Sequence, residues 1–310
     1  MLRPGAGPGE AVTAVGTRAS RLARAQTAWV LYRLRAAVPD RRWVEVLIST
    51  AGDQGHVGAL GTGVFVKEIE QALLDGGIDL AVHSLKDVPT DPVPGLTIAA
   101  VPERADPRDA LVGAELRALP AGARVGTGSP RRAAQLLRIR SDLEVVPIRG
   151  NVPTRVERVR SGQVAAVVLA AAGLERLGIP ADDFFDPEEL LPAPGQGALA
   201  IQVREGDADL GPLVAALDHP PTRSAVTAER AILRGLGGGC MLPVATYARH
   251  TGGVLVVEGA VTSADGTRQA RARAEGEPSM AMALGAAVAE QLMDLGALQL
   301  LEQGTVARQP

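Results

Sequence analysis

Three turns in the sequence place small polar residues beside arginine, a combination suited to binding anions. They read GTRASR at 16–21, GTGSPRR at 126–132 and RGNVPTR at 149–155, each before an expected helix. Free backbone N–H groups at a helix N-terminus attract anions, and arginine binds a carboxylate or phosphate through parallel hydrogen bonds. Helix capping alone also explains any single turn, and Ser129 with Pro130 is a typical N-cap and N1 pair. Three such turns in one chain predict a ligand with several negative charges.

The segment VHSLKDVPT at 82–90 places a carboxylate directly after an expected strand. Asp87 beside Lys86 is either a surface ion pair of little energetic value or, in a binding cleft, a group that stabilises a developing cation and moves protons. His83 has no second histidine at metal-ligand spacing. We therefore interpret His83 as structural and predict no metal site.

Cys240 is the single cysteine of the chain and follows Gly237, Gly238 and Gly239. One cysteine forms no internal disulfide and supplies no cysteine-rich metal site. It is either a small buried hydrophobic residue, or a covalent attachment point or nucleophile that the glycines leave accessible. A second glycine-rich segment, at 55–63, is a candidate mobile lid.

The composition excludes several classes of function. The formal net charge is −3 and aromatic residues make up 2%, whereas nucleic-acid binding favours a basic surface and aromatic stacking platforms. No apolar run reaches transmembrane length, and the N-terminus lacks the apolar core of a signal peptide. We expect a cytoplasmic protein, since a lone cysteine suits a reducing compartment.

The hydrophobic pattern alternates short strands with amphipathic helices and predicts two tandem α/β domains facing a cleft. No internal sequence repeat is evident, and a third, smaller α+β region starts near Pro221. The expected boundaries are domain 1 at 1–104 with 203–221, domain 2 at 105–202 and domain 3 at 222–310. The expected strands are 12–15, 44–48, 80–83, one ending at 125, 145–148, 165–169, 244–248, 254–261 and 269–274; the expected helices are 20–37, 65–74, 130–139, 152–161, 222–233 and 280–298.

Between about Val15 and Ala248 the sequence resembles the porphobilinogen deaminase (hydroxymethylbilane synthase) family. The resemblance rests on the joint order and spacing of GTRASRLARAQ, FVKEIE, AVHSLKDVPT, DPRDAL, GT-S-RR-AQL, RGNV-TR, LPAPGQGA, TAER and GGGC. It implies two domains of the periplasmic-binding-protein type around a cleft, with a small C-terminal α+β domain that carries the cysteine.

The resemblance also implies an activity. The family is a transferase of porphyrin and haem biosynthesis that condenses four porphobilinogen molecules head to tail into hydroxymethylbilane, a linear tetrapyrrole, and releases ammonia at each addition. Its cofactor is a dipyrromethane joined by a thioether to the cysteine that corresponds to Cys240. The implied partners are porphobilinogen and its growing chain, without nucleic acid or membrane, and the implied state is a monomer. The alternative function is a non-catalytic binder of a polycarboxylate.

The resemblance assigns roles to individual residues. Asp87 corresponds to the catalytic aspartate, which stabilises cationic intermediates and helps to move protons. The implied cofactor- and substrate-binding residues are Arg18, Ser20, Phe65, Ser84, Lys86, Thr127, Ser129, Arg131, Arg132, Arg149, Arg155, Arg176 and Gln196.

Three stretches depart from the family pattern. The first helix has Arg21 and Arg24 where small or apolar residues are common. Thr62 stands where lysine is usual, and the turn at 126–132 has Gly128 and Pro130 where the family usually has serine and leucine. Because Asp87, Cys240 and the arginines are present, we expect retained activity with altered binding of the chain.

Overall fold

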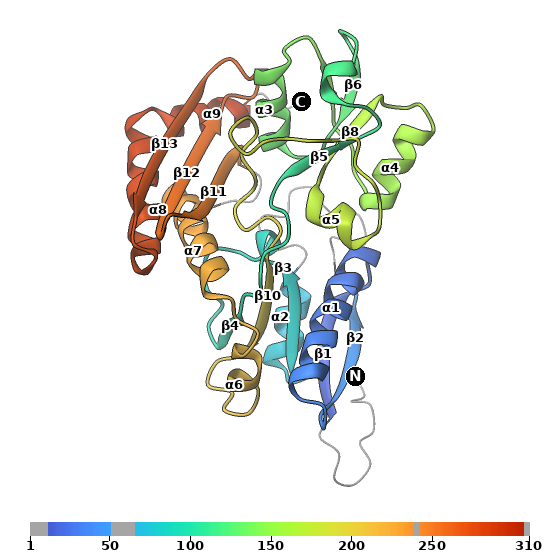
Figure 1. Cartoon of the computed structure of the whole chain (residues 1–310), viewed down its shortest axis with the longest axis vertical. Coiled ribbons are helices and arrows are strands. Elements are labelled where there is room, and N and C mark those ends of the chain that lie inside the picture. Colours follow the sequence, from blue (N-terminus) through green and yellow to red (C-terminus); the bar gives the residue numbers. More distant parts are fainter. Residues whose placement is uncertain (1–11, 51–65, 239–241, 307–310) are drawn as a thin grey trace. The chain divides into compact units, whose positions relative to one another are not determined.

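The computed structural model describes residues 12–50, 66–238 and 242–306 (Figure 1). The chain divides into two compact units. Unit 1 comprises Met1–Arg104 and Ala198–Arg223, and unit 2 comprises Ala105–Gly197 and Ser224–Pro310.

Unit 1 is built on one five-stranded sheet in the order β2-β1-β3-β10-β4, the first sheet. Strand β1 is parallel to β2 and β3, whereas β10 is antiparallel to β3 and β4. Two adjacent residues of β1 belong to different apolar clusters. Val15 is in one cluster with Leu34 of α1, and Ala14 is in another with Ile69 of α2. The first sheet is therefore covered on both faces, as the continuous apolar strands require. The elements are β1 Val12–Arg18, α1 Arg21–Ala37, β2 Arg42–Ile48, α2 Lys67–Leu74, β3 Leu80–Ser84, β4 Leu96–Ala100, β10 Leu199–Arg204 and α6 Leu210–Ala215.

Unit 2 begins with the second sheet, in the order β7-β6-β8-β5-β9. Strand β6 is parallel to β7 and β8, and β5 is antiparallel to β8 and β9. The strand order of the first sheet is thus repeated, although the sequence shows no repeat. The fourth strand of each order is out of sequence: β10 follows all the strands of the second sheet, and β5 precedes the other strands of its own sheet. The elements are β5 Asp109–Val112, β6 Arg124–Gly126, α3 Pro130–Ile139, β7 Glu144–Val146, α4 Val152–Arg160, β8 Ala166–Ala170, α5 Ala171–Arg176 and β9 Asp183–Phe184.

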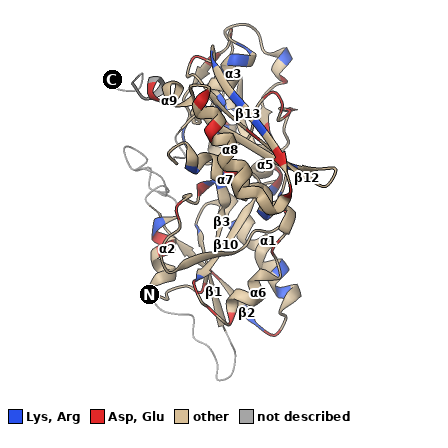
Figure 2. Cartoon of the chain, turned by 90° about the vertical axis from the view of Figure 1, so that its left-hand side faces the viewer, with Lys and Arg blue, Asp and Glu red and all other residues tan. Residues whose placement is uncertain are grey.

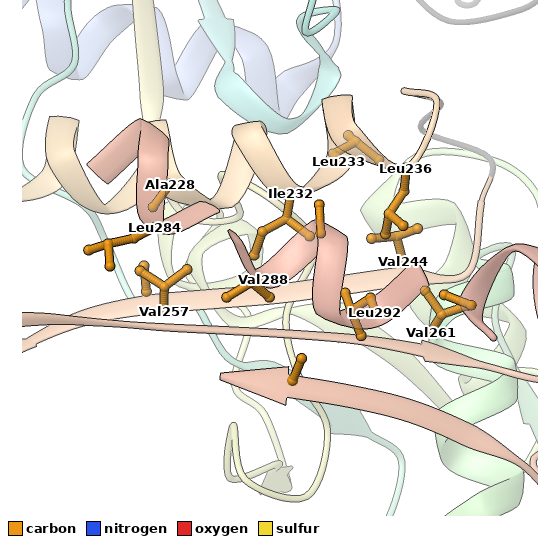
Figure 3. Packing of buried hydrophobic residues seen from close by; sticks show 14 of the residues in the cluster. Ala228, Ile232, Leu233, Leu236, Val244, Val257, Val261, Leu284, Val288 and Leu292 are labelled. Atoms are coloured by element: carbon orange, nitrogen blue, oxygen red, sulfur yellow. The ribbon is translucent and has the colours of Figure 1, made fainter. Parts of the chain in front are cut away.

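The third sheet, also in unit 2, is an antiparallel meander in the order β11-β12-β13. Figure 3 shows Ile232 of α7 and Val288 of α8 packed over Val257 of β12, in the largest apolar cluster of the described residues. The elements are α7 Pro220–Gly235, β11 Val244–Thr251, β12 Val254–Thr262, β13 Gln269–Gly276, α8 Ala281–Asp294 and α9 Ala297–Val306.

The architecture confirms the predicted fold class, two α/β domains of the periplasmic-binding-protein type and a small α+β domain. In Figure 2 the ribbon of β3 is tan, since its sequence LAVHS contains no Lys, Arg, Asp or Glu, whereas β13, QARARAEG, has segments coloured for charged residues. The predicted boundary at 202/203 falls inside β10, which pairs with β3 and β4 and so belongs to the first sheet.

The helix predicted at 280–298 is two helices. Helix α8 ends at Asp294 and α9 starts at Ala297, because Gly296 adopts the left-handed conformation with φ 83° that terminates a helix. Backbone helix then continues to Val306. The sequence analysis also assigned no strand to β4, β5, β9 or β10, which are short or flanked by proline and glycine.

Candidate functional site

In unit 1, Asp87 lies at the carboxyl end of the first sheet. Strand β3 ends at Ser84 and continues into a short 3-10 turn, Leu85–Asp87, in which Asp87 is half-buried. Strand β1 is the parallel neighbour of β3 and ends at Arg18. Two predicted binding residues and the predicted catalytic residue therefore share one sheet edge, where α/β folds usually bind ligands.

Two predicted serines of unit 1 are held in place by local hydrogen bonds. Ser20 is the N-cap of α1 and accepts a hydrogen bond from the Ala23 N–H at 3.3 Å. The Ser84 hydroxyl lies 2.8 Å from Nε2 and 3.1 Å from Oε1 of Gln26, on α1. These contacts fix the side chains while each hydroxyl keeps further hydrogen-bonding capacity.

His83 is buried beneath this edge, consistent with its structural interpretation. Its Nε2 lies 3.0 Å from Gln202 Oε1, and Gln202 Nε2 donates to Glu70 Oε1 at 3.1 Å. Burial lowers the pKa of His83 to about 4, a hydrogen bond with Gln202 opposes this, and the charge of Arg18 lowers the pKa further. His83 is therefore neutral near pH 7.

In unit 2, the turn between β6 and α3 has the predicted capping arrangement. Ser129 is the N-cap of α3 and accepts from the Arg132 N–H at 3.5 Å, with Pro130 in the first turn. Thr127 is buried, and its Oγ1 accepts from the Ser129 N–H at 3.2 Å. The predicted cap and N1 pair is confirmed, and the turn projects α3 toward β5.

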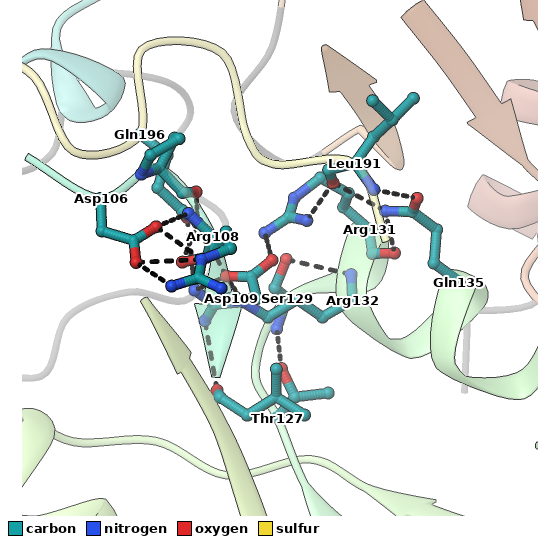
Figure 4. A network of polar contacts seen from close by, with 12 residues as sticks. Asp106, Arg108, Asp109, Thr127, Ser129, Arg131, Arg132, Gln135, Leu191 and Gln196 are labelled. Atoms are coloured by element: carbon teal, nitrogen blue, oxygen red, sulfur yellow. Dashed lines mark hydrogen bonds and ion pairs between the residues drawn. The ribbon is translucent and has the colours of Figure 1, made fainter. Parts of the chain in front are cut away.

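Arg131 and Arg132 form a buried ion cluster with Asp109 (Figure 4). The two arginines are 3% and 6% exposed and Asp109 is 0% exposed. Arg131 Nη2 lies 2.7 Å from Asp109 Oδ2, and Arg132 donates to Oδ1 from Nη2 at 2.7 Å and from Nε at 2.9 Å. Gln196 Nε2 also donates to Oδ1, at 2.8 Å. Burial raises the pKa of Asp109, but the charges of Arg131 and Arg132 and the hydrogen bonds from Arg132 and Gln196 outweigh it and lower the pKa to about 2.

Three more predicted arginines lie around the second sheet in different environments. Arg155, on α4, donates to the Gly150 carbonyl at 2.7 Å, and its pKa is lowered by burial and by the charges of Arg132 and Arg158. Arg176 ends α5 and donates to the Gly197 carbonyl at 2.9 Å, and burial lowers its pKa. Arg149 is exposed. The charges of Arg132 and Arg155 repel each other, so this region of unit 2 favours a bound anion.

Gly128 departs from the family pattern for a local steric reason. A Cβ on Gly128 would lie 2.6 Å from the Ile148 carbonyl oxygen, a backbone atom with little freedom to move. With this backbone, a serine side chain at 128 does not fit without a shift of the turn.

Several sequence predictions lie outside the described residues: Phe65, Thr62, Cys240 and the candidate lid at 55–63. Within the described part of unit 1, the structure brings together Arg18, Ser20, Ser84, Lys86 and Asp87; within unit 2 it brings together Thr127, Ser129, Arg131, Arg132 and Gln196.

Sequence reasoning missed two buried carboxylates of unit 2. Asp109 is one; Glu229 of α7 is the other, and it accepts from the Gly195 N–H at 2.7 Å and from the Ala248 N–H at 2.8 Å. Asp109 lies in the motif DPRDAL and Glu229 in the motif TAER, both of which belong to the family resemblance. The only sequence feature that marked Asp109 was its position as an acidic residue at the start of a short apolar run. In the described ranges, no group of three or more His, Cys, Asp or Glu could hold a metal ion, and no helix there is long and apolar enough to cross a membrane.

Comparison with known proteins identifies the family. Residues 13–211 match the model described as porphobilinogen deaminase, dipyromethane cofactor binding domain, and residues 224–294 match the porphobilinogen deaminase C-terminal domain. The chain belongs to the porphobilinogen deaminase family. It is 49% identical over 298 residues to the porphobilinogen deaminase of Thermus thermophilus, which covers 94% of this chain and 99% of that protein. It is 50% identical over 304 residues to that of Acidothermus cellulolyticus, covering 94% and 91%.

Comparison with solved structures also finds the BvgS periplasmic VFT2 domain of Bordetella pertussis, with a TM-score of 0.37, 17% identity and coverage of 66% of this chain and 85% of that one. Membership of the porphobilinogen deaminase family favours an enzyme over the alternative function, a non-catalytic polycarboxylate binder.

Proposed function

We propose that the protein is a hydroxymethylbilane synthase, a transferase that joins four porphobilinogen molecules head to tail and releases one ammonia at each addition. The observation that carries the proposal is the match to two family models. The first includes Asp87 and the proposed binding arginines, and the second includes the region of Cys240. The buried cationic cluster of unit 2 supports it, because every pyrrole unit bears an acetate and a propionate.

We assign the attachment of a dipyrromethane cofactor to Cys240, through a thioether. The described residues before it support this role: Gly237 and Gly238 have φ values of 90° and 52°, a left-handed backbone that side chains rarely adopt. When bound, this cofactor supplies the free pyrrole carbon at which chain growth begins. The net positive charge around Arg131, Arg132 and Arg155 fits its carboxylates.

Asp87 is our candidate for the chemistry. For each addition the amino group of porphobilinogen takes up a proton to leave as ammonia, positive charge develops on the pyrrole that remains, and the attacking pyrrole carbon then loses a proton. A half-buried carboxylate stabilises that charge more strongly than an exposed one and can accept the proton. The position of Asp87 after β3 supports this role.

The remaining binding residues fall into two sets. Arg18, Ser20, Ser84 and Lys86 of unit 1 and Thr127, Ser129, Arg131, Arg132, Arg149, Arg155, Arg176 and Gln196 of unit 2 are proposed to bind cofactor and substrate, together with Phe65. We also propose three domains with the attachment cysteine on the third, and a monomer that works in the cytoplasm. Size-exclusion chromatography with light scattering tests the monomer.

The mass of the intact protein tests the attachment. Protein purified from cells is expected to carry the added mass of two pyrrole units, and Cys240→Ser is expected to lack it and to be inactive. An unmodified wild-type protein with full activity would contradict the attachment.

The variant Asp87→Asn distinguishes the proposed enzyme from the alternative function, a non-catalytic polycarboxylate binder. We expect porphobilinogen consumption to fall about 10²–10⁴-fold while binding is retained, because the amide keeps the shape and loses the charge. Asp91→Asn, an exposed carboxylate in the same segment, is the matched control and is expected to be as active as the wild type. Equal activity of Asp87→Asn and Asp91→Asn would favour the binder.

A further inference from the structure

Asp109 is the first residue of β5 and the point on which several polar groups of unit 2 converge. Besides Arg131, Arg132 and Gln196, the residue that follows β9 also contacts it: the Phe185 N–H donates to the Asp109 carbonyl at 2.9 Å. Gln196 Nε2 also donates to the Pro107 carbonyl, at 2.8 Å. Asp109 is therefore held firmly by its backbone and by the turn that contains Gln196.

The cluster contains more positive than negative charges. Two guanidinium groups face one carboxylate, which leaves a net charge of about +1, and the nearby Arg155 adds to it. Burial of adjacent cations is costly unless they are paired. Without Asp109, two repelling arginines would have no carboxylate partner among the described residues.

The contacts also fix how each guanidinium is turned. Arg132 uses one edge, Nε and Nη2, on a single carboxylate oxygen, and its Nη1 donates to the Val168 carbonyl at 3.3 Å. Arg131 donates from Nη1 to the Leu191 carbonyl at 2.6 Å, while its Nη2 lies 2.7 Å from Asp109 Oδ2. Two long, flexible side chains are thereby restricted to one orientation before a ligand arrives, which lowers the entropic cost of binding.

We propose that Asp109 is a positioning residue for the reaction: it orients Arg131 and Arg132 and sets their combined charge, so that the pair receives one carboxylate of the pyrrole chain. This inference rests on the proposed function. Asp109 touches neither substrate nor reacting atoms, and it acts through the arginines.

A purely structural role makes a different prediction about kinetics. If Asp109 only supports folding, Asp109→Asn lowers the amount of active enzyme and hence the maximal rate, while the KM of the folded fraction stays unchanged. If Asp109 positions the arginines, the folded fraction has a raised KM for porphobilinogen.

The experiment compares wild type, Asp109→Asn and Asp109→Glu as complete proteins, with the folded fraction measured by circular dichroism and KM measured with porphobilinogen. We expect Asp109→Asn to raise KM about tenfold, the effect of one hydrogen-bonded charge. Asp109→Glu keeps the charge but displaces it by one methylene, and is expected to fold and to raise KM by a smaller factor. The control is Asp106→Asn, whose partly exposed ion pair with Arg108 is expected to leave KM unchanged.

A double variant tests whether the effect passes through an arginine. Asp109→Asn combined with Arg132→Gln has the net charge of the wild-type cluster and is expected to be more stable than Asp109→Asn alone. In the Arg132→Gln background, Asp109→Asn is expected to raise KM by a smaller factor than in the wild type, less than about threefold, because only one of the two arginines that Asp109 positions is left.

The inference is overturned if KM of both folded Asp109 variants equals that of the wild type, or if Asp109→Asn has its full effect in the Arg132→Gln background. A wild-type protein that consumes no porphobilinogen would instead overturn the proposed function, so the two failures are distinguishable.

Discussion

In both α/β sheets the parallel strands end at an edge lined by polar turns, but the polar groups differ in kind. At the first sheet the pairs Ser84 with Gln26 and His83 with Gln202 are neutral hydrogen-bonded groups, and the carboxylate of Asp87 is half-buried. At the second sheet the buried partners are the ions Asp109, Arg131 and Arg132. One strand order therefore supports two different electrostatic environments.

The difference suggests a division of labour. The pKa of Asp109 is held at about 2 and arginine stays protonated, so the second sheet keeps a constant charge across the physiological pH range and suits binding of anions. The first sheet instead presents the half-buried carboxylate of Asp87 on the same edge as Arg18 and Lys86, which suits the proposed role of Asp87 beside a developing cation. Topology supplies the position, and the residues directly after each strand supply the chemistry.

The largest effect should come from breaking the ion cluster of the second sheet. Arg132→Gln removes the hydrogen bonds that a buried guanidinium makes to Asp109, the Val168 carbonyl and Gln196, and it leaves Asp109 with one cation, so we expect the free energy of unfolding to fall by about 3–5 kcal/mol. Urea denaturation measures it. Arg160→Gln, in an exposed pair with Glu157, is expected to cost about 0–1 kcal/mol. Equal costs would mean that burial of the cluster has no energetic weight.

A slightly smaller effect is expected at the first sheet when the pH is lowered. The folded-state pKa of His83 is depressed from 6.5 to about 4, so the unfolded chain binds the proton more readily. The contribution of neutral His83 to the free energy of unfolding is complete above pH 6.5. It is lost as the pH falls from 6.5 to 4, and the total loss is about 3 kcal/mol. Asp109, lowered from 3.8 to about 2, loses its contribution only below pH 4. Acid should therefore weaken the first sheet before the second.

Comparison with His83→Gln isolates this effect. Glu70 is hydrogen-bonded to Gln202, the partner of His83, and burial raises its pKa above 4.5. The folded state therefore binds this proton more readily than the unfolded state, and Glu70 stabilises the fold as the pH falls. Because Glu70 is present in both proteins, the difference in unfolding free energy between wild type and His83→Gln at each pH cancels most of its contribution. A difference that stays constant between pH 7 and pH 4 would exclude titration of His83 as the cause.

The sequence predicted the parts of the site that depend on local order. The Ser129–Pro130 cap and the placement of Asp87 after a strand follow from neighbours in the chain, and both were found. Asp109 was missed because its partners are 22 and 23 residues away on α3 and 87 residues away at Gln196. No local pattern records such a convergence, since it arises only when β5 enters a sheet made by later strands. For the same reason β10 was assigned to no sheet.

The smallest effect concerns two similar turns, one in each sheet. Both begin with Gly-Thr, which is followed by Arg18 in the first sheet and by Gly128 in the second. A Cβ at 128 would meet the Ile148 carbonyl oxygen at 2.6 Å, so Gly128→Ser, which introduces the serine usual in the family, is expected to destabilise the protein by about 1–2 kcal/mol. Thermal unfolding measures it, with Gly211→Ser as the control because a Cβ there has open space. If Gly128→Ser is as stable as the wild type, the turn of the second sheet has room for a side chain, as the first has for Arg18. The difference between the two turns would then lie in their side chains alone and not in their backbones.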